Sequence, residues 1–329
     1  MTELAERLLA RDRDAVSEAL NLVDDRRPAQ RDAALSMLAA VERGSAAAGA
    51  YRVGVTGAPG AGKSTLLDAC LRELRAADAT VGIIAVDPSS QRTGGALLGD
   101  RFRMRSSARD PGIFVRSMAA RERLGGLADS THAGVEILAS VFDYVFVETV
   151  GVGQSEGDVA RQVDTTVFVA QPGAGDMLQF MKAGVLELPD IFVVNKADLG
   201  AVANRTASEL GAGLGLGERK STAWKAPVLM TSARDGDGIA QLLAAIREHR
   251  AALEEANELG ALRANARASH VLEALVRRFG SFGLERVGGS EALRARVSAA
   301  CRQEGASAFE LLRQLAREIQ DSIAGSDVS

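Results

Sequence analysis

The run Gly57-Ala-Pro-Gly-Ala-Gly-Lys-Ser-Thr65 constrains the fold of this chain more than any other feature. It matches the pattern G-x-x-x-x-G-K-[ST], in which glycines let the backbone turn so that its amides point inward at phosphate groups. The apolar run Arg52–Thr56 precedes it, and the helical pattern Leu66–Leu74 follows it. The N-terminus of that helix adds its positive dipole to the loop. The run therefore predicts a P-loop between a strand and a helix, whereas the dinucleotide pattern G-x-G-x-x-G is not present here.

Short apolar runs rich in Val, Ile and Phe alternate with helical stretches from Tyr51 onward. Beyond Arg52–Thr56 they are Val81–Val86, Ile113–Arg116, Tyr144–Val147, Thr166–Ala170, Ile191–Val194 and Val228–Met230. Continuous apolar strands separated by helices are typical of a parallel sheet covered on both faces. We therefore expect an α/β fold, a doubly wound and mainly parallel sheet of the P-loop NTPase kind. Ligands of such sheets bind beyond the carboxyl ends of the strands.

The two ends of the sequence are helical in pattern and carry no motif. Residues 1–50 repeat apolar side chains at helical spacing, and after about Glu255 the strand pattern stops. We predict an N-terminal helical extension over residues 1–50, a P-loop domain over residues 51–255, and a C-terminal helical region over residues 256–329. The stretch from Phe279 to Gly289 contains four glycines and is predicted to be a hinge or loop.

Lysine is rare in this chain, which makes its positions informative. Only five of the 39 basic residues are lysine, and the rest are arginine. A compact ammonium does work that a planar guanidinium cannot do. Lys63 is expected to reach the β- and γ-phosphates of a nucleotide, and Ser64 to offer a hydroxyl to Mg²⁺.

A second motif, Asn195-Lys-Ala-Asp198, directly follows an apolar run. A carboxylate at Asp198 can accept from N1–H and the 2-amino group of guanine, a pair of donors that adenine lacks. The stem of Lys196 can lie over the base, and Asn195 can tie this loop to the P-loop. A later run, Thr231-Ser-Ala233, fits a loop that presents a backbone amide to guanine O6. The motifs select GTP and GDP as ligands, and the predicted nucleotide-binding residues are Gly57, Gly60, Ala61, Gly62, Lys63, Ser64, Thr65, Gly151, Asn195, Lys196, Asp198, Ser232 and Ala233.

Carboxylates that end the predicted strands suggest a magnesium site. Glu148 ends the run Tyr144–Val147 and is followed three residues later by Gly151, the arrangement of a Walker-B strand and its switch. Asp87 ends another strand, and Asp100 lies in a Gly-Asp-Arg turn. The predicted metal residues are Ser64, Asp87, Asp100 and Glu148. The predicted catalytic residues are Lys63, Asp100, Glu148 and Gln154, the last as a residue that could orient water.

Composition limits the class of partner and the compartment. The net charge of −4 argues against nucleic acid or an anionic membrane as the main partner. The two cysteines, Cys70 and Cys301, have no metal spacing and are expected to be buried apolar residues or free thiols. The first residues lack the basic start and apolar run of a signal peptide, so we expect a cytoplasmic protein.

Longer strings resemble the MeaB/ArgK family of SIMIBI-class GTPases, bacterial relatives of the human methylmalonic aciduria type A protein. The resemblance spans about residues 53–233 and includes VDPSS, GGALLGDRFRM, FVETVGVGQSE, QPGAGDMLQFMKAG and VVNKADL. It implies a GTP-hydrolysing chaperone that gates cobalamin loading and protects or reactivates an adenosylcobalamin-dependent acyl-CoA mutase. It also implies a homodimer held largely by the C-terminal helices, and a cobalamin adenosyltransferase as a further partner.

The same resemblance implies roles for individual positions. Lys63, Ser64, Asp87, Asp100 and Glu148 match the family's phosphate and magnesium residues, and Asn195, Lys196 and Asp198 match its base readers. The segment 173–184 resembles an additional switch loop that contacts the mutase, with Asp176, Gln179 and Lys182 as its partner-switch residues. Some strings depart from the family, as at Gln91-Arg-Thr93, so a mutase acting on a substrate other than methylmalonyl-CoA is an open alternative.

Two other functions use the same core. A small-molecule kinase, acting on an amino acid or amine, would share the P-loop, but no segment offers an obvious acceptor pocket. A nickel-type metallochaperone would need a metal site rich in His or Cys, which three histidines and two isolated cysteines do not supply.

Overall fold

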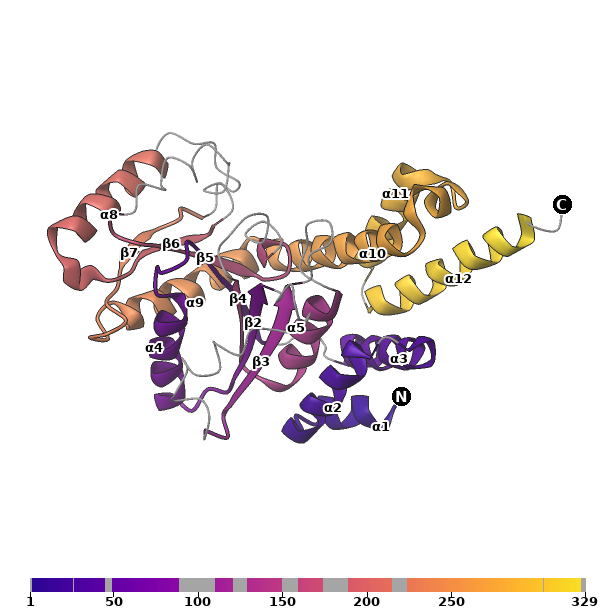
Figure 1. Ribbon diagram of the computed structural model, residues 1–329, viewed down its shortest axis with the longest axis horizontal. Helices are drawn as coiled ribbons and strands as arrows, with labels where there is room; N and C mark the ends of the chain where they lie inside the picture. The colour runs from indigo at the N-terminus through magenta and orange to yellow at the C-terminus, as the bar shows by residue number, and fades with distance from the viewer. Residues whose placement is uncertain are drawn as a thin grey trace. The chain divides into compact units, whose positions relative to one another are not determined.

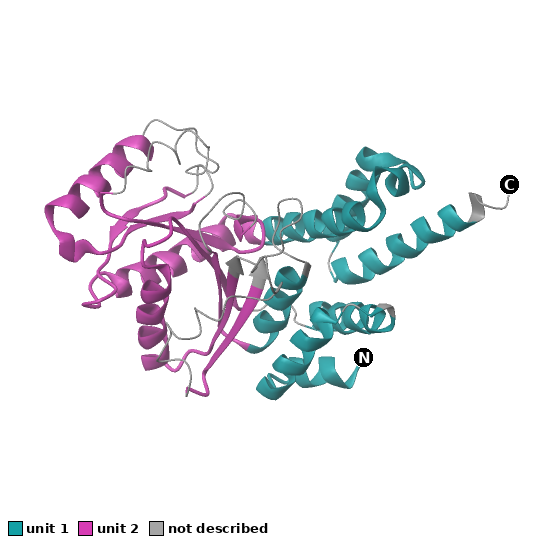
Figure 2. Cartoon of the chain, viewed as in Figure 1, with its two compact units in different colours: residues 1–49, 129–141, 260–329 teal, residues 50–128, 142–259 magenta. Residues whose placement is uncertain are grey.

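The computed structural model describes residues 2–25, 27–44, 49–88, 110–120, 129–149, 159–173, 189–214, 224–303 and 305–326. The chain divides into two compact units (Figure 2). One comprises residues 50–128 and 142–259 and is called the sheet unit here, and the other comprises residues 1–49, 129–141 and 260–329 and is called the helical unit. The three-segment division expected from the sequence stays a prediction.

The described residues of the sheet unit form a seven-stranded sheet in which all neighbouring strands are parallel. The strands are β1 (Tyr51–Thr56), β2 (Val81–Pro88), β3 (Ile113–Ala120), β4 (Tyr144–Thr149), β5 (Thr165–Ala170), β6 (Ile191–Val194) and β7 (Val228–Met230). All seven apolar runs are thus strands, and the predicted fold class is confirmed. Their order is β3-β2-β4-β1-β5-β6-β7, and the strands other than β1 are labelled in Figure 1.

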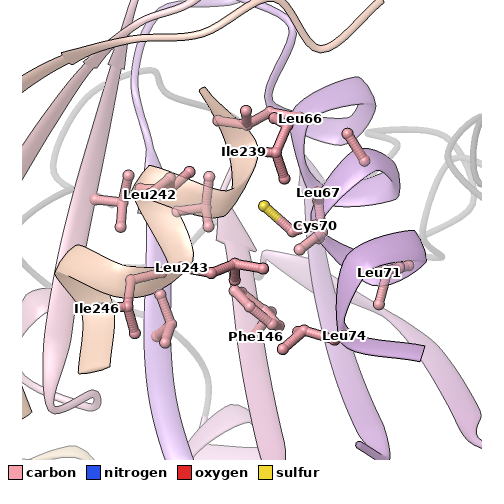
Figure 3. Packing of buried hydrophobic residues seen from close by; sticks show 14 of the residues in the cluster. Leu66, Leu67, Cys70, Leu71, Leu74, Phe146, Ile239, Leu242, Leu243 and Ile246 are labelled. Carbon is pink, nitrogen blue, oxygen red and sulfur yellow. The ribbon is translucent and has the colours of Figure 1, made fainter. Parts of the chain in front are cut away.

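Alternate residues of the central strands face opposite sides of the sheet, and both sides are buried. Along β5, Val167 and Val169 join one core, whereas Phe168 and Ala170 join another. The first core lies under α4 (Lys63–Ala76) and α9 (Ile239–Glu255), which interdigitate Leu, Ile and Cys70 side chains (Figure 3). The second lies under α8 (Ala201–Leu214). This two-sided burial explains why the strands read as continuous apolar runs.

The central strand β1 lies between β4 and β5. Strands β2, β3 and β4 lie on one side of β1, and β5, β6 and β7 lie on the other, so the strand order reverses at β1. Such a reversal opens a crevice at the carboxyl ends of the strands, where ligands bind. The loop after β1 carries the glycine-rich motif. Glu148, next to the last residue of β4, and Asn195, directly after β6, both lie at this end of the sheet and contact that motif or the start of α4. The topology therefore gathers the sequence motifs at one edge.

The helical unit contains α1 (Glu3–Leu9), α2 (Arg13–Asp24), α3 (Pro28–Gly44), α5 (Asp129–Val141), α11 (Gly289–Cys301), α12 (Ala308–Ser326) and most of α10 (Glu258–Glu285). The side chains of Thr2 and Asp12 cap α1 and α2 by accepting from backbone amides. Val271, Leu275, Leu315 and Ile319 form a core shared by α10 and α12. Within the described ranges, no helix combines the length and hydropathy needed to cross a membrane.

The hinge or loop expected from Phe279 to Gly289 is present as two breaks. Gly280 leaves helical geometry inside α10, with φ 62° and ψ −169°, and residues 286–288 form a turn between α10 and α11, with Gly288 at φ 97°. Leu284 is 2% exposed and packs into the core of the helical unit. Burial of that side chain outweighs the low helix propensity of Gly283, so residues 281–285 are helical between the two breaks.

Candidate nucleotide site

Close packing against neighbouring backbone explains the glycines of the loop between β1 and α4. Gly57 has φ 133°, and a Cβ placed on it would lie 2.1 Å from the carbonyl oxygen of Val169 in β5. Gly62 has φ 89°, and its Cβ would lie 2.6 Å from Asn195 Nδ2. A side chain at either position would meet both a strained backbone and a clash. The loop is therefore held against β5 and against the loop after β6.

Lys63, at the start of α4, is buried with 7% of its surface exposed. Its Nζ donates to the carbonyl oxygens of Gly57 at 2.8 Å and Ala58 at 3.1 Å. A compact ammonium on a flexible stem can donate to both oxygens from one point. Within the same turn Ser64 is half-buried and Thr65 is exposed. The positive charge thus lies within the loop that would surround the phosphates.

The Ser64 hydroxyl donates to Glu148 Oε1 at 2.6 Å. Glu148 lies on β4, paired in register with Val55 of β1, and is 5% exposed. A hydroxyl and a carboxylate side by side are hard oxygen ligands of the type that Mg²⁺ prefers, so these residues fit the ion. Asp87 lies on β2 one residue beyond Val86, which pairs with Thr149, but its side chain is outside the described residues.

The loop after β6 is tied to the glycine-rich loop by two side chains. Asn195 Nδ2 donates to the carbonyl oxygen of Ala61 at 3.0 Å, and Lys196 Nζ donates to that of Gly60 at 2.8 Å. Asn195 Oδ1 accepts from Thr231 Oγ1 and from the Ala233 amide, both at 3.2 Å. Asn195 is 1% exposed, and its hydrogen bonds join the loops that follow β1, β6 and β7. The expected link between Asn195 and the P-loop is present as a hydrogen bond.

Asp198 follows on a short 3₁₀ turn (Ala197–Leu199) with its carboxylate beside the loop after β7. Its Oδ1 accepts from Ser232 Oγ at 3.1 Å, and its Oδ2 lies 3.6 Å from Arg234 Nη1. The side chain is 24% exposed, so it can meet a ligand from solution. An orientated carboxylate next to the phosphate loop can accept two parallel donors from a purine edge.

Other predicted residues lie outside the described residues. These are Asp100, Gly151, Gln154, Asp176, Gln179 and Lys182. Conversely, sequence reasoning did not single out Arg234 or Asp235, which contact the predicted base reader through charge and through Ser232. Their position directly after Thr231-Ser-Ala233 was the signal that could have found them.

Comparisons with known proteins agree with this geometry. The sequence model of a family described as methylmalonyl-CoA mutase-associated GTPase MeaB matches residues 16–279. A protein of Pyrococcus horikoshii is 46% identical over 260 residues, which cover 78% of this chain and 80% of that protein. GTPase ArgK of Escherichia coli is 36% identical over 266 residues, covering 80% of each. The mouse methylmalonic aciduria type A homolog is 35% identical over 262 residues, covering 76% of this chain and 63% of its own length.

A solved structure, that of a LAO/AO transport system kinase, superposes with a TM-score of 0.68 and 28% sequence identity, covering 97% of each chain. It extends the likeness beyond the sheet to both helical ends. The segment Asn195–Asp198 after β6 is called the base loop here. The P-loop, the base loop and the family match together show that this chain is a GTPase of the MeaB family.

Proposed function

We propose that this GTPase is a magnesium-dependent chaperone of an adenosylcobalamin-dependent acyl-CoA mutase, gating cobalamin loading and protecting or reactivating the enzyme. The match of residues 16–279 to a family described as mutase-associated carries the proposal. The partner enzyme acts on methylmalonyl-CoA or a related acyl-CoA, and a cobalamin adenosyltransferase supplies the cofactor. The protein works as a homodimer in the cytoplasm.

In this proposal the glycine-rich loop binds the phosphates of GTP. The Lys63 ammonium moves from the Gly57 and Ala58 carbonyls to the β- and γ-phosphate oxygens, which are stronger acceptors. Ser64 and Glu148, whose side chains are hydrogen-bonded to each other, would hold Mg²⁺ together with Asp87 and Asp100. When bound, the ion would supply charge neutralisation on the phosphate oxygens. Gln154 would orient the attacking water, and the Gly151 amide would bind the γ-phosphate.

The base loop selects guanine. Asp198 accepts from N1–H and the 2-amino group, while the Lys196 stem covers one face of the base. The hydrogen bond from Lys196 to Gly60 supports this arrangement, because it draws that stem across the space between the base loop and the phosphate loop. Ser232 and Ala233 complete the guanine site from the loop after β7. A backbone amide of that loop is expected to turn toward guanine O6.

Measuring GTP turnover with and without purified acyl-CoA mutase tests the proposed function. We expect slow intrinsic hydrolysis that methylmalonyl-CoA mutase or a related mutase, loaded with adenosylcobalamin, accelerates. Unchanged turnover with every adenosylcobalamin-dependent mutase of the source organism would exclude the chaperone role.

A small-molecule kinase is the alternative function, and the solved relative is named as a kinase. The two functions differ in where the γ-phosphate goes. A chaperone GTPase releases it as inorganic phosphate, whereas a kinase transfers it to an amino acid or amine. Following labelled γ-phosphate in the presence of basic amino acids decides between them.

A further inference from the structure

The hydroxyl of Ser232 is shared by two carboxylates on the base side of the site. Ser232 Oγ lies 3.1 Å from Asp198 Oδ1 and 2.8 Å from Asp235 Oδ2. A hydroxyl has one proton and can donate to only one acceptor at a time. The shorter distance favours Asp235. Asp198, the proposed guanine reader, therefore competes with a neighbouring negative charge for its own orienting donor.

Arg234 contacts both of these carboxylates. Its Nε donates to Asp235 Oδ1 at 3.0 Å, and its Nη1 lies 3.6 Å from Asp198 Oδ2. The first contact is a hydrogen bond, while the second is longer than one and acts through charge alone. The lone pairs of Asp198 Oδ2 thus remain open to a ligand. Asp235 is charged at neutral pH, and the Arg234 guanidinium, followed by the Ser232 hydroxyl, lowers its pKa further.

We propose that Arg234 is a positioning residue for guanine recognition, because its charge offsets Asp235 and lets Asp198 keep both oxygens aimed at the base edge. This inference rests on the proposed role of Asp198. Without Arg234, two like charges would share one hydroxyl, and repulsion would turn Asp198 away from the position set by Ser232. The affected property is discrimination by the 2-amino group rather than phosphate binding, since Lys63 and Ser64 lie on another element, α4.

The comparison of GDP with IDP isolates this property, because IDP lacks only the 2-amino group. The wild-type protein should bind GDP more tightly than IDP. Arg234→Ala should lower that preference about two- to fivefold, the range expected for an exposed ion pair. Arg234→Lys should restore part of it, since it keeps the charge. Arg247→Ala, an exposed arginine on α9, serves as the matched control and should leave the preference unchanged.

A double-mutant cycle supplies the sharper test. If Arg234 acts by offsetting Asp235, then Asp235→Asn removes the need for it. The pair Arg234→Ala/Asp235→Asn should therefore regain the wild-type preference for GDP. Failure of that rescue, an unchanged preference in Arg234→Ala, or tighter GDP binding in that variant would each overturn the proposal.

The reference variant Asp198→Asn separates this inference from the proposed site. Retention of the GDP preference by Asp198→Asn would mean that the base reader lies elsewhere, and the proposed site would fail first. Loss of the preference in Asp198→Asn with no effect of Arg234→Ala would leave the site intact and refute only the role of Arg234. Thermal melting of each variant confirms that differences in binding do not come from unfolding.

Discussion

The lysines of the site make contacts that depend on the shape of an ammonium in an arginine-rich chain. Lys63 is buried against two carbonyl oxygens, and Lys196 reaches a third across the loop. A guanidinium is broader and planar, and it presents its donors in a rigid fork rather than from one point. The choice of lysine at these positions is thus a consequence of local geometry.

Replacing Lys63 with alanine should reduce GTP turnover about a hundredfold or more, because one preorganised positive donor is lost from the phosphate site. GDP binding should weaken as well. Steady-state phosphate release measures the effect. Lys63→Arg keeps the charge and should lose most of the activity too. Turnover within a fewfold of wild type in Lys63→Ala would show that this loop is not the phosphate site.

Glu148→Gln keeps the size of the side chain and removes its charge beside Ser64. We expect the Mg²⁺ concentration for half-maximal turnover to rise about tenfold or more, as for other residues that support a metal ion. A magnesium titration of GTP hydrolysis measures the shift. Glu73→Gln, at an exposed position on α4, is the control and should behave as wild type. An unshifted titration would place the ion's protein ligands elsewhere.

Asp198→Asn should exchange guanine for xanthine as the preferred base. The carboxylate accepts from N1–H and the 2-amino group, whereas an amide can donate to the 2-oxo group of xanthine. Competition between GDP and XDP measures the preference directly. A variant that still favours GDP would argue against Asp198 as the base reader.

At the scale of elements, the helical unit encloses a buried polar cluster that sequence spacing does not show. Glu42 of α3 accepts from Ser307 Oγ at 2.7 Å, and Arg267 of α10 lies 3.7 Å from its other oxygen. Burial, and then the charge of Glu136 on α5, raise the pKa of Glu42 to about 7 from an ordinary value of 4.5. Nearby, the rings of His132 and His270 stack with centroids 4.1 Å apart.

This raised pKa predicts how stability depends on pH. The folded protein holds a proton on Glu42 that the unfolded chain releases above about pH 4.5. The stabilising contribution of protonated Glu42 to the free energy of unfolding is therefore complete below pH 4.5. It is lost as pH rises through about 7, with a total on the order of 3 kcal/mol. Glu42→Gln should remove this pH dependence. The free energy of unfolding of the variant should therefore rise relative to that of the wild type between pH 5 and pH 8.

Chemical denaturation at pH 5 and pH 8 measures the effect, with the exposed Glu291→Gln on α11 as the control. The free energy of unfolding of Glu42→Gln relative to wild type should increase with pH, and that of Glu291→Gln should not. Equal pH dependence of all three proteins would show that Glu42 titrates normally in the folded state.

At the scale of the whole molecule, a chaperone GTPase must pass information from its nucleotide to its partner. The segment that follows Gly173 is proposed to do so, and its residues Asp176, Gln179 and Lys182 lie outside the described residues. Gly173 itself ends the described part of that connection after β5, with φ 73° and its amide donating to Thr206 of α8. The proposed switch thus begins from a fixed point on the sheet unit.

Asp176→Ala and Lys182→Ala should leave GDP affinity and basal hydrolysis nearly unchanged while removing the acceleration by the mutase. GTP turnover with and without the cognate mutase measures this for each variant. Lys225→Ala, at an exposed position before β7, is the control and should retain full stimulation. Full stimulation in both test variants would mean that the segment is only a connection.

Short stretches of the sequence predicted many of the strands, helices and loops of this protein. The seven strands could be located because a strand buried on both faces needs an unbroken apolar run, and the P-loop because its turn requires glycine at positions such as Gly57. Both requirements act within a few residues. The helical ends were predictable for the same reason, since the spacing of apolar residues alone predicts which stretches can bury one face.

Contacts between distant segments were decided only by the tertiary structure. The order of the strands, the bond between Lys196 and Gly60, and that between Glu42 and Ser307 join residues whose neighbours in sequence give no sign of the partner. Gly280 and Gly288 lie outside helical geometry while Gly283 is helical, because burial of Leu284 outweighed local propensity. Packing free energy depends on which surfaces meet, and that is a property of the whole fold rather than of any window along the chain.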